Sequence, residues 1–203
     1  MTPERREKLL SVLKKRQNNL AVVLENVQDP HNISAVMRTC DAVGVQEIYV
    51  LNTLIPRHKK FGPKSSSSAA KWLTVRQFDN ASYCFTELRK KYSRILTTHL
   101  GADSVDLYHI DFTASVALVF GNEHSGVSDE IRPLADGNFV IPQVGIIRSL
   151  NISVACAVCL YEAFRQKKSA GHYNGRVPEG TEFELLLREW ELNEGEPHFP
   201  DEK

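Results

Sequence analysis

The chain has 203 residues, of which 42% are hydrophobic and 25% are charged. This composition is typical of a folded domain with a sizeable core and excludes a largely disordered chain. No apolar run reaches the length of a membrane span, and the charged N-terminus does not resemble a signal peptide. We therefore expect a cytoplasmic protein that neither spans nor binds a membrane.

The cysteines give little sign of metal or redox chemistry. Cys156 and Cys159 form a C-x-x-C pair, but the pair lies in an apolar helical run without a second Cys/His pair. We interpret the pair as small core residues and predict no metal site. Cys40 and Cys84 complete the set of four, which fits a reducing compartment.

Positive and negative charges cancel overall but occupy different parts of the chain. Residues 1–16 carry six cations against two anions, whereas residues 177–203 carry nine anions against two cations. A second basic segment holds Arg57, Lys59, Lys60, Lys64, Lys71 and Arg76. This split predicts a phosphate-binding face with an acidic tail kept away from it. Solvated helix faces are the alternative, and we adopt that interpretation for the tail.

Apolar runs and helical periodicity predict alternating helices and strands. Strands are expected over 20–27, 47–51, 72–75, 95–98, 116–120 and 139–141. Helices are expected over 3–16, 32–43, 80–92, 128–134, 150–168 and 181–191. A long polar loop over 52–70 includes the run Ser65–Ser68, and such length usually accompanies function or disorder.

This alternation predicts an α/β fold with a mostly parallel sheet and helices on both faces. Ligands then bind beyond the carboxyl ends of the strands. Three loops, 98–101, 121–123 and 141–150, follow predicted strands and are expected to meet at that edge. The sequence lacks a G-x-G-x-x-G motif, so a nucleotide-binding oxidoreductase is disfavoured.

Three sequence blocks each follow or end a predicted strand. The first runs from Asn32 to Gly44 and contains Arg38, and the second is Phe120-Gly-Asn-Glu-His-Ser-Gly-Val. The third is Ile141-Pro-Gln-Val-Gly-Ile-Ile-Arg-Ser-Leu-Asn-Ile-Ser-Val-Ala, a strand end, a loop and a helix start. Free backbone groups in such a loop suit a flat heterocycle, although for this block by itself we favour an ordinary capped strand–loop–helix joint.

Taken in this order, the three blocks resemble the motifs of the SpoU/TrmH group of SPOUT RNA methyltransferases, over about residues 20–168. The resemblance implies methyl transfer from S-adenosylmethionine to a ribose 2′-hydroxyl of RNA. It also implies a homodimer and a deep trefoil knot in the C-terminal part of the fold. For the homodimer, the strongly apolar helix over 150–168 is the expected interface.

The resemblance also assigns site residues. Those matching catalytic positions are Asn32, Arg38, Glu123, Ser149 and Asn151, and the expected cofactor contacts are Thr98, Leu100, Gly121, Ile141 and Leu150. Each has a structural alternative: helix capping for Asn32, a surface ion pair for Arg38, a helix-dipole contact for Glu123, and core packing for the apolar residues. Arg38 could hold a phosphate or, if desolvated, act as the base.

Features outside the motifs suggest the RNA. A basic N-terminal helix (1–18) precedes the expected methyltransferase domain (19–170), and an acidic, partly helical extension (171–203) follows it. Relatives acting on guanosine 18 in the tRNA D-loop carry such extensions, so this is the expected target. The expected phosphate contacts are Arg5, Lys8, Lys15 and Arg16. Ribosomal RNA, the tRNA wobble nucleotide and a catalytically inactive RNA-binding module are the alternatives.

Overall fold

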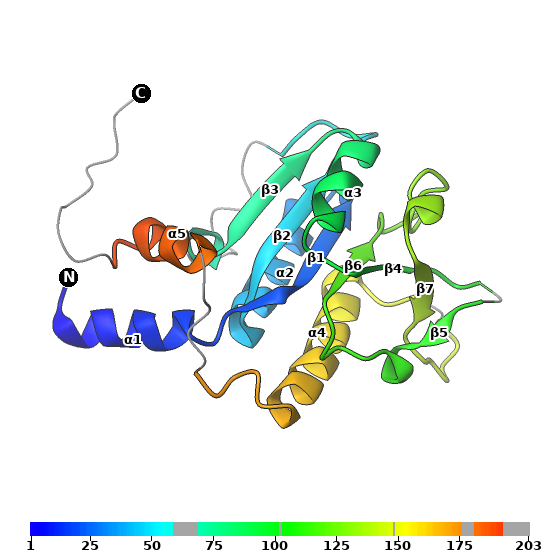
Figure 1. Ribbon diagram of the computed structural model, residues 1–203. Helices are drawn as coiled ribbons and strands as arrows, with labels where there is room; N and C mark the ends of the chain where they lie inside the picture. The colour runs from blue at the N-terminus through cyan, green and yellow to red at the C-terminus, as the bar shows by residue number, and fades with distance from the viewer. Residues whose placement is uncertain (59–68, 102, 148, 176–180, 193–203) are drawn as a thin grey trace.

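The computed structural model describes residues 1–58, 69–101, 103–147, 149–175 and 181–192. Seven strands form one parallel sheet in the order β3-β2-β1-β6-β4-β7-β5 (Figure 1). The mostly parallel sheet predicted from the sequence is confirmed. The strands are β1 Gln17–Glu25, β2 Val45–Leu51, β3 Thr74–Phe78, β4 Arg94–Thr98, β5 Val105–Asp106, β6 Val116–Phe120 and β7 Gly137–Val140.

Helices cover both faces of this sheet (Figure 1). Helices α2 (Pro30–Val43) and α4 (Ile152–Ser169) contribute to one apolar cluster with Val22 and Leu24 of β1. Helix α3 (Ala81–Arg89) packs in a second cluster with Ala21 and Val23. Successive β1 residues thus enter opposite cores, as expected for a strand buried on both faces. All four cysteines are buried and unpaired, which agrees with the interpretation of Cys156 and Cys159 as core residues.

The two terminal extensions pack on each other at one end of the molecule (Figure 1). Helix α1 (Pro3–Leu13) begins at Thr2, whose hydroxyl accepts from the Arg5 amide, and helix α5 spans Thr181–Glu189. A third apolar cluster of Leu13, Trp190 and Leu192 joins them. The boundaries 1–18, 19–170 and 171–203 remain predictions. In the described part of the chain, no helix has the length and apolarity needed to cross a membrane.

Several element boundaries differ from the sequence prediction for identifiable reasons. The helix predicted over 128–134 is only a 3-10 turn, Arg132–Leu134, because Pro133 lacks the amide that a longer helix requires. Strand β3 begins at Thr74, after a 3-10 turn over Ala69–Trp72. Strand β5 has two residues, too few to produce a periodic signal. The Ser65–Ser68 run lies outside the described residues.

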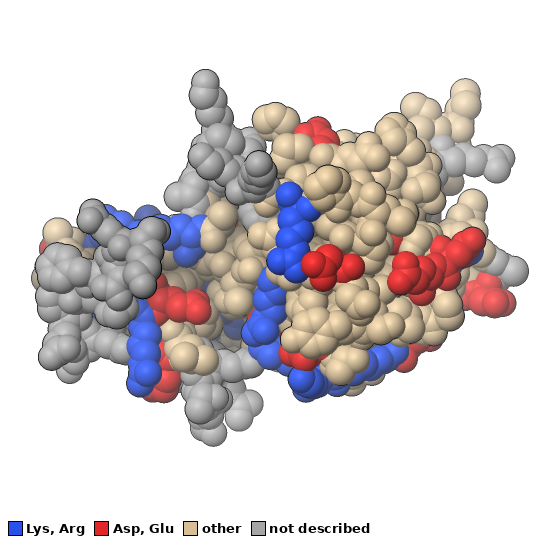
Figure 2. All heavy atoms as spheres, turned by 90° about the horizontal axis from the view of Figure 1, so that it is seen from above, with Lys and Arg blue, Asp and Glu red and all other residues tan. Residues whose placement is uncertain are grey.

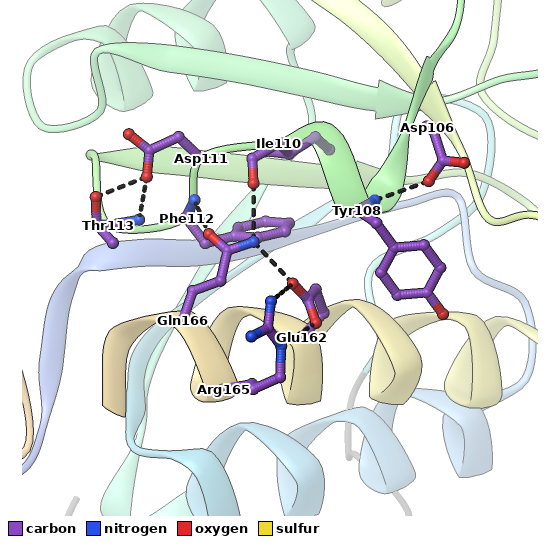
Figure 3. Close-up of polar contacts among 9 residues, drawn as sticks. All are labelled: Asp106, Tyr108, Ile110, Asp111, Phe112, Thr113, Glu162, Arg165 and Gln166. Carbon is purple, nitrogen blue, oxygen red and sulfur yellow. Dashed lines mark hydrogen bonds and ion pairs between the residues drawn. The ribbon is translucent and has the colours of Figure 1, made fainter. Parts of the chain in front are cut away.

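One side chain fastens the segment before β6 to helix α4 (Figure 3). Gln166 of α4 accepts from the Phe112 amide at 2.9 Å and donates to the Ile110 carbonyl at 3.0 Å. It also donates to Glu162 at 2.8 Å, so its amide group is fully engaged. Near the end of α4, the fully buried Lys167 donates to Asn19 of β1 at 2.6 Å. These contacts tie α4 to distant parts of the chain, and the knot stays a prediction from the resemblance.

Candidate active site

The loops after β4, β6 and β7 meet at the carboxyl edge of the sheet and enclose a pocket of about 730 Å³. This volume lies in the range of small-molecule sites. Each residue predicted to contact a cofactor lines the pocket, although the five come from three loops. They are Thr98, Leu100, Gly121, Ile141 and Leu150.

A chain of side-chain hydrogen bonds borders this pocket. Asn151 donates through Nδ2 to Oδ1 of Asn32 at 3.1 Å, and Asn32 donates through Nδ2 to Oε1 of Glu123 at 3.0 Å. Glu123, Ser149 and Asn151 line the pocket, whereas Asn32 lies behind Glu123 and Asn151. Four of the five predicted catalytic residues therefore lie at or beside one pocket.

The environment of Glu123 favours its anionic form. Burial opposes ionisation, but hydrogen bonds from the Asn32 side chain and from the Gln28 and Asp29 amides outweigh it and hold the pKa of Glu123 below its ordinary value. The two amide bonds measure 3.2 and 3.5 Å. These backbone donors were not anticipated, since sequence periodicity does not show which loop amides converge on a carboxylate.

Of the two asparagines predicted at the site, one caps a helix and the other does not. Asn151 caps α4, because its Oδ1 accepts from the Ser153 amide at 2.8 Å. The cap of α2 is Asp29, which accepts from the His31 amide at 2.8 Å. The capping alternative for Asn32 is therefore wrong, and Asn32 is available to orient Glu123.

Gly121 occupies a position with no room for a side chain. A Cβ atom at this residue would lie 2.1 Å from the Gly126 carbonyl carbon. The close approach arises because Asn122 and Gly126 exchange two backbone hydrogen bonds, of 3.0 and 2.9 Å, and close a turn that carries Glu123. The Gly-Asn-Glu block in the sequence pointed to this position, and the tight turn is the physical reason that residue 121 must be glycine.

Two predicted residues lie elsewhere. Arg38 is exposed on α2 and does not line the pocket. Arg38 lies six positions after Asn32, so the two side chains leave the helix in different directions and about 9 Å apart along the axis. Arg16, predicted to contact RNA, is 6% exposed, pairs with Asp41 at 2.5 Å and lies over the Trp190 ring. Arg16 thus makes buried structural contacts, and we do not propose it as a phosphate contact.

The lining suits a cofactor that carries positive charge and a flat ring. No lysine or arginine of the described residues lines the pocket, and Glu123 is its one described carboxylate. Leu100, Ile141 and Leu150 provide apolar walls, and residues 141–145, 149 and 150 of the loop after β7 also line the pocket. S-adenosylmethionine, with its sulfonium, ammonium and adenine groups, fits this set. The described residues contain no group of three or more His, Cys, Asp or Glu placed to hold a metal ion.

Comparison with known proteins places these features in a family. The model of the SpoU rRNA Methylase family matches residues 19–161. The chain is 39% identical to the tRNA (guanosine(18)-2′-O)-methyltransferase of Thermus thermophilus, over 93% of this chain and 96% of that protein.

Solved structures agree with this match. The TrmH/SpoU tRNA modifying enzyme of Aquifex aeolicus is similar with a TM-score of 0.84 and 37% identity, over 92% of this chain and 94% of that one. The SpoU methyltransferase AviRb from Streptomyces viridochromogenes, solved with the cofactor AdoMet, has a TM-score of 0.67 and 28% identity, over 76% of this chain and 62% of that one.

Proposed function

This chain belongs to the SpoU rRNA methylase family, and we propose that its target within that family is guanosine 18 of tRNA. The chain is an S-adenosylmethionine-dependent RNA 2′-O-methyltransferase. The observation that carries the tRNA proposal is the match to the Thermus enzyme over 93% of this chain and 96% of that protein. That match includes most of the extensions outside the methyltransferase domain.

The pocket residues divide the work of the reaction. S-adenosylmethionine supplies a methyl group on a positively charged sulfur. Thr98, Gly121 and the loop over 141–150 bind the cofactor, while Leu100, Ile141 and Leu150 flank its ring. Glu123, held anionic and fixed by Asn32, orients the ribose, with Ser149 and Asn151 beside it. Alignment of the hydroxyl with the methyl group supplies much of the rate enhancement in such a reaction.

Arg38 acts on the RNA backbone in this proposal. Its exposed position on α2 suits a guanidinium that holds the phosphate beside the target nucleotide. Held near the hydroxyl by a bound phosphate, the guanidinium would stabilise the negative charge that develops on the oxygen as the proton passes to solvent water. Service as the general base requires strong desolvation, and an exposed side chain does not provide it.

Helix α1 is the proposed contact for the rest of the tRNA. Arg5 and Lys8 on α1 and Lys15, two residues past its end, are exposed, and a row of cations attracts successive phosphates. On the face that Figure 2 views, a narrow band of basic side chains is bordered by acidic side chains. In the second basic segment, Arg57 pairs with Asp79 and Arg76 with Glu47; Lys59, Lys60 and Lys64 lie outside the described residues.

The functional unit proposed is a homodimer that pairs through α4. Val154 and Tyr161 are 47% and 55% exposed and lie on the same face of α4, two turns apart. Leu150, just before the helix, is 39% exposed. A contiguous apolar strip on a helix surface marks an interaction site, and a second copy of the chain supplies the same strip by two-fold symmetry. Buried, unpaired cysteines support a cytoplasmic setting.

One experiment tests the substrate. The purified protein is incubated with radiolabelled S-adenosylmethionine and unfractionated tRNA, and the 2′-O-methylated nucleotide is mapped. Methylation at guanosine 18 is expected, and a transcript with adenosine at that position serves as the control. Methylation of the wobble nucleotide, or of ribosomal RNA alone, would replace the proposed target. Absence of cofactor binding would favour an inactive RNA-binding module.

A further inference from the structure

The three residues that follow β1, Asn26 to Gln28, connect two loops at the edge of the sheet that holds the pocket. On one side they bond to the loop after β2, residues 52–58. On the other side they bond to the turn after β6, residues 121–126, which carries Glu123. Strand β1 ends at Glu25 and α2 begins at Pro30, so neither element requires these bonds.

Asn26 supplies the bonds to the loop after β2. It is 3% exposed and adopts a left-handed backbone with φ of 50°, a conformation that few residues other than glycine and asparagine tolerate. Its Nδ2 donates to the Thr53 hydroxyl at 3.0 Å, and its Oδ1 accepts from the Leu54 amide at 2.9 Å. Both ends of one buried side chain therefore hold this loop.

The backbone of the same segment reaches the catalytic turn. The Asn26 carbonyl accepts from Nδ2 of Asn122 at 2.8 Å, and the Gln28 amide donates to Glu123 at 3.2 Å. Between them, the Val27 carbonyl accepts from Nε2 of His58 at 2.8 Å. Consecutive residues thus bond to both loops, so movement of one loop is transmitted to the other.

We propose that Asn26 is a positioning residue that fixes the loop over 52–58, as an RNA-contacting element, to the turn that bears Glu123. The loop follows the carboxyl end of β2, at the same sheet edge as the pocket, and presents Leu54 at 76% exposure together with Arg57. RNA bound at Glu123 therefore lies beside this loop. The inference rests on the RNA methyl transfer described above and adds a loop and a residue to it.

Asn26→Gly is the test variant, because glycine keeps the left-handed backbone and removes the side-chain bonds to Thr53 and Leu54, together with a 3.3 Å bond from Nδ2 to Glu25. The dissociation constant for S-adenosylmethionine should change less than about twofold, while KM for RNA rises about tenfold, the scale expected when one or two hydrogen bonds are lost. Thr53→Val removes one of the bonds from the other end. The double variant should be no worse than Asn26→Gly, since both changes break the same contact.

Asn26→Ala provides the contrast, because alanine is strained at this φ and displaces the Asn26 carbonyl from Asn122. It should weaken cofactor binding as well as RNA binding. A native KM for RNA in Asn26→Gly would overturn the inference, and so would a parallel loss of cofactor binding, which would make Asn26 merely structural. The variant-to-native ratios of KM and of the dissociation constant are measured with whichever RNA the native enzyme methylates. A wrong substrate assignment would therefore appear in the native enzyme and would not affect this test.

Discussion

Asn32 and Asn151 lie 119 positions apart in the chain, and a hydrogen bond of 3.1 Å joins their side-chain amides. Asn32 in turn donates a hydrogen bond to Glu123 at 3.0 Å. The beginnings of α2 and α4 and the turn after β6 are thereby connected through a single amide. Asn32 occupies the middle position, so its removal separates Glu123 from α4.

Asn32→Ala should shift the pH dependence of the reaction. It deprives Glu123 of its side-chain donor, so the pKa of Glu123 rises, and the acidic limb of the single-turnover rate moves to higher pH. The lowered native pKa contributes stability above the pKa of an unfolded glutamate, and that contribution is lost as pH falls through the native pKa. Ser153→Ala is the control, because the Ser153 hydroxyl donates to Asn151 and the variant leaves the bond from Asn32 to Glu123 in place. Superimposable acidic limbs would contradict this role.

Gly121→Ala should weaken cofactor binding more than about tenfold, because one methyl group displaces the backbone of Gly126 and Val127 and opens the turn. Gly137→Ala is the control, since Gly137 of β7 is not among the pocket-lining residues and a Cβ there meets only the Leu96 side chain, at 3.7 Å. Isothermal titration with S-adenosylmethionine measures both, with circular dichroism to verify folding. Equal affinities in the two variants would place the cofactor elsewhere.

Arg38→Ala should retain folding and cofactor affinity and lose roughly 100-fold or more in single-turnover rate, the scale of one lost electrostatic contact to the reacting group. Arg38→Lys should recover part of the rate, because lysine keeps the charge and loses the planar fork. The control is Arg94→Ala, an exposed arginine at the opposite end of the strands. A rate close to native in Arg38→Ala would assign Arg38 to the surface.

Replacing Arg5, Lys8 and Lys15 by glutamine should weaken tRNA binding and flatten its salt dependence. If each contacts one phosphate, the slope of log K against log salt falls by about 2 to 3. Glu4→Gln with Glu7→Gln on the same helix should not flatten it. Filter binding between low and high salt measures both sets, and an unchanged slope in the triple variant would make α1 a solvated helix.

The parallel sheet and most of its strands could be predicted because continuous apolar runs mark strands that are buried on both faces. Val116–Phe120 was predicted to the residue. The helix over 128–134 was wrong because the apolar pattern outweighed Pro133 in the prediction. Local periodicity reports burial, and it is weakest where a single residue type decides the backbone.

Motif spacing located the pocket, since residues after parallel strands meet at one edge. It did not reveal that Asp29 caps α2, that the Gln28 amide supports Glu123, or that Asn26 connects two loops. These contacts depend on how loops distant in sequence close on each other. Arg16 shows the same limit for charge, because a basic segment does not indicate which arginine is buried against a carboxylate, as Arg16 is against Asp41.

The homodimer leads to the last prediction. Val154→Glu places a charge in the exposed apolar strip of α4, which costs little in a monomer, because Val154 is already 47% exposed there. In a dimer paired through this strip, two such charges would lie close together and desolvated. Sedimentation equilibrium at micromolar concentration should show a dimer for the native protein and a monomer for the variant, with unchanged circular dichroism.

Leu185→Glu is the matched control, because Leu185 is 53% exposed on α5, outside the proposed interface, and it should remain dimeric. The comparison also tests whether Arg38 serves a pocket formed by both subunits. If it does, the Val154→Glu monomer keeps cofactor affinity, since the pocket lining belongs to one chain, yet loses methyl transfer. A native monomer with full activity at this concentration would refute the dimer, and with it any site that depends on two chains.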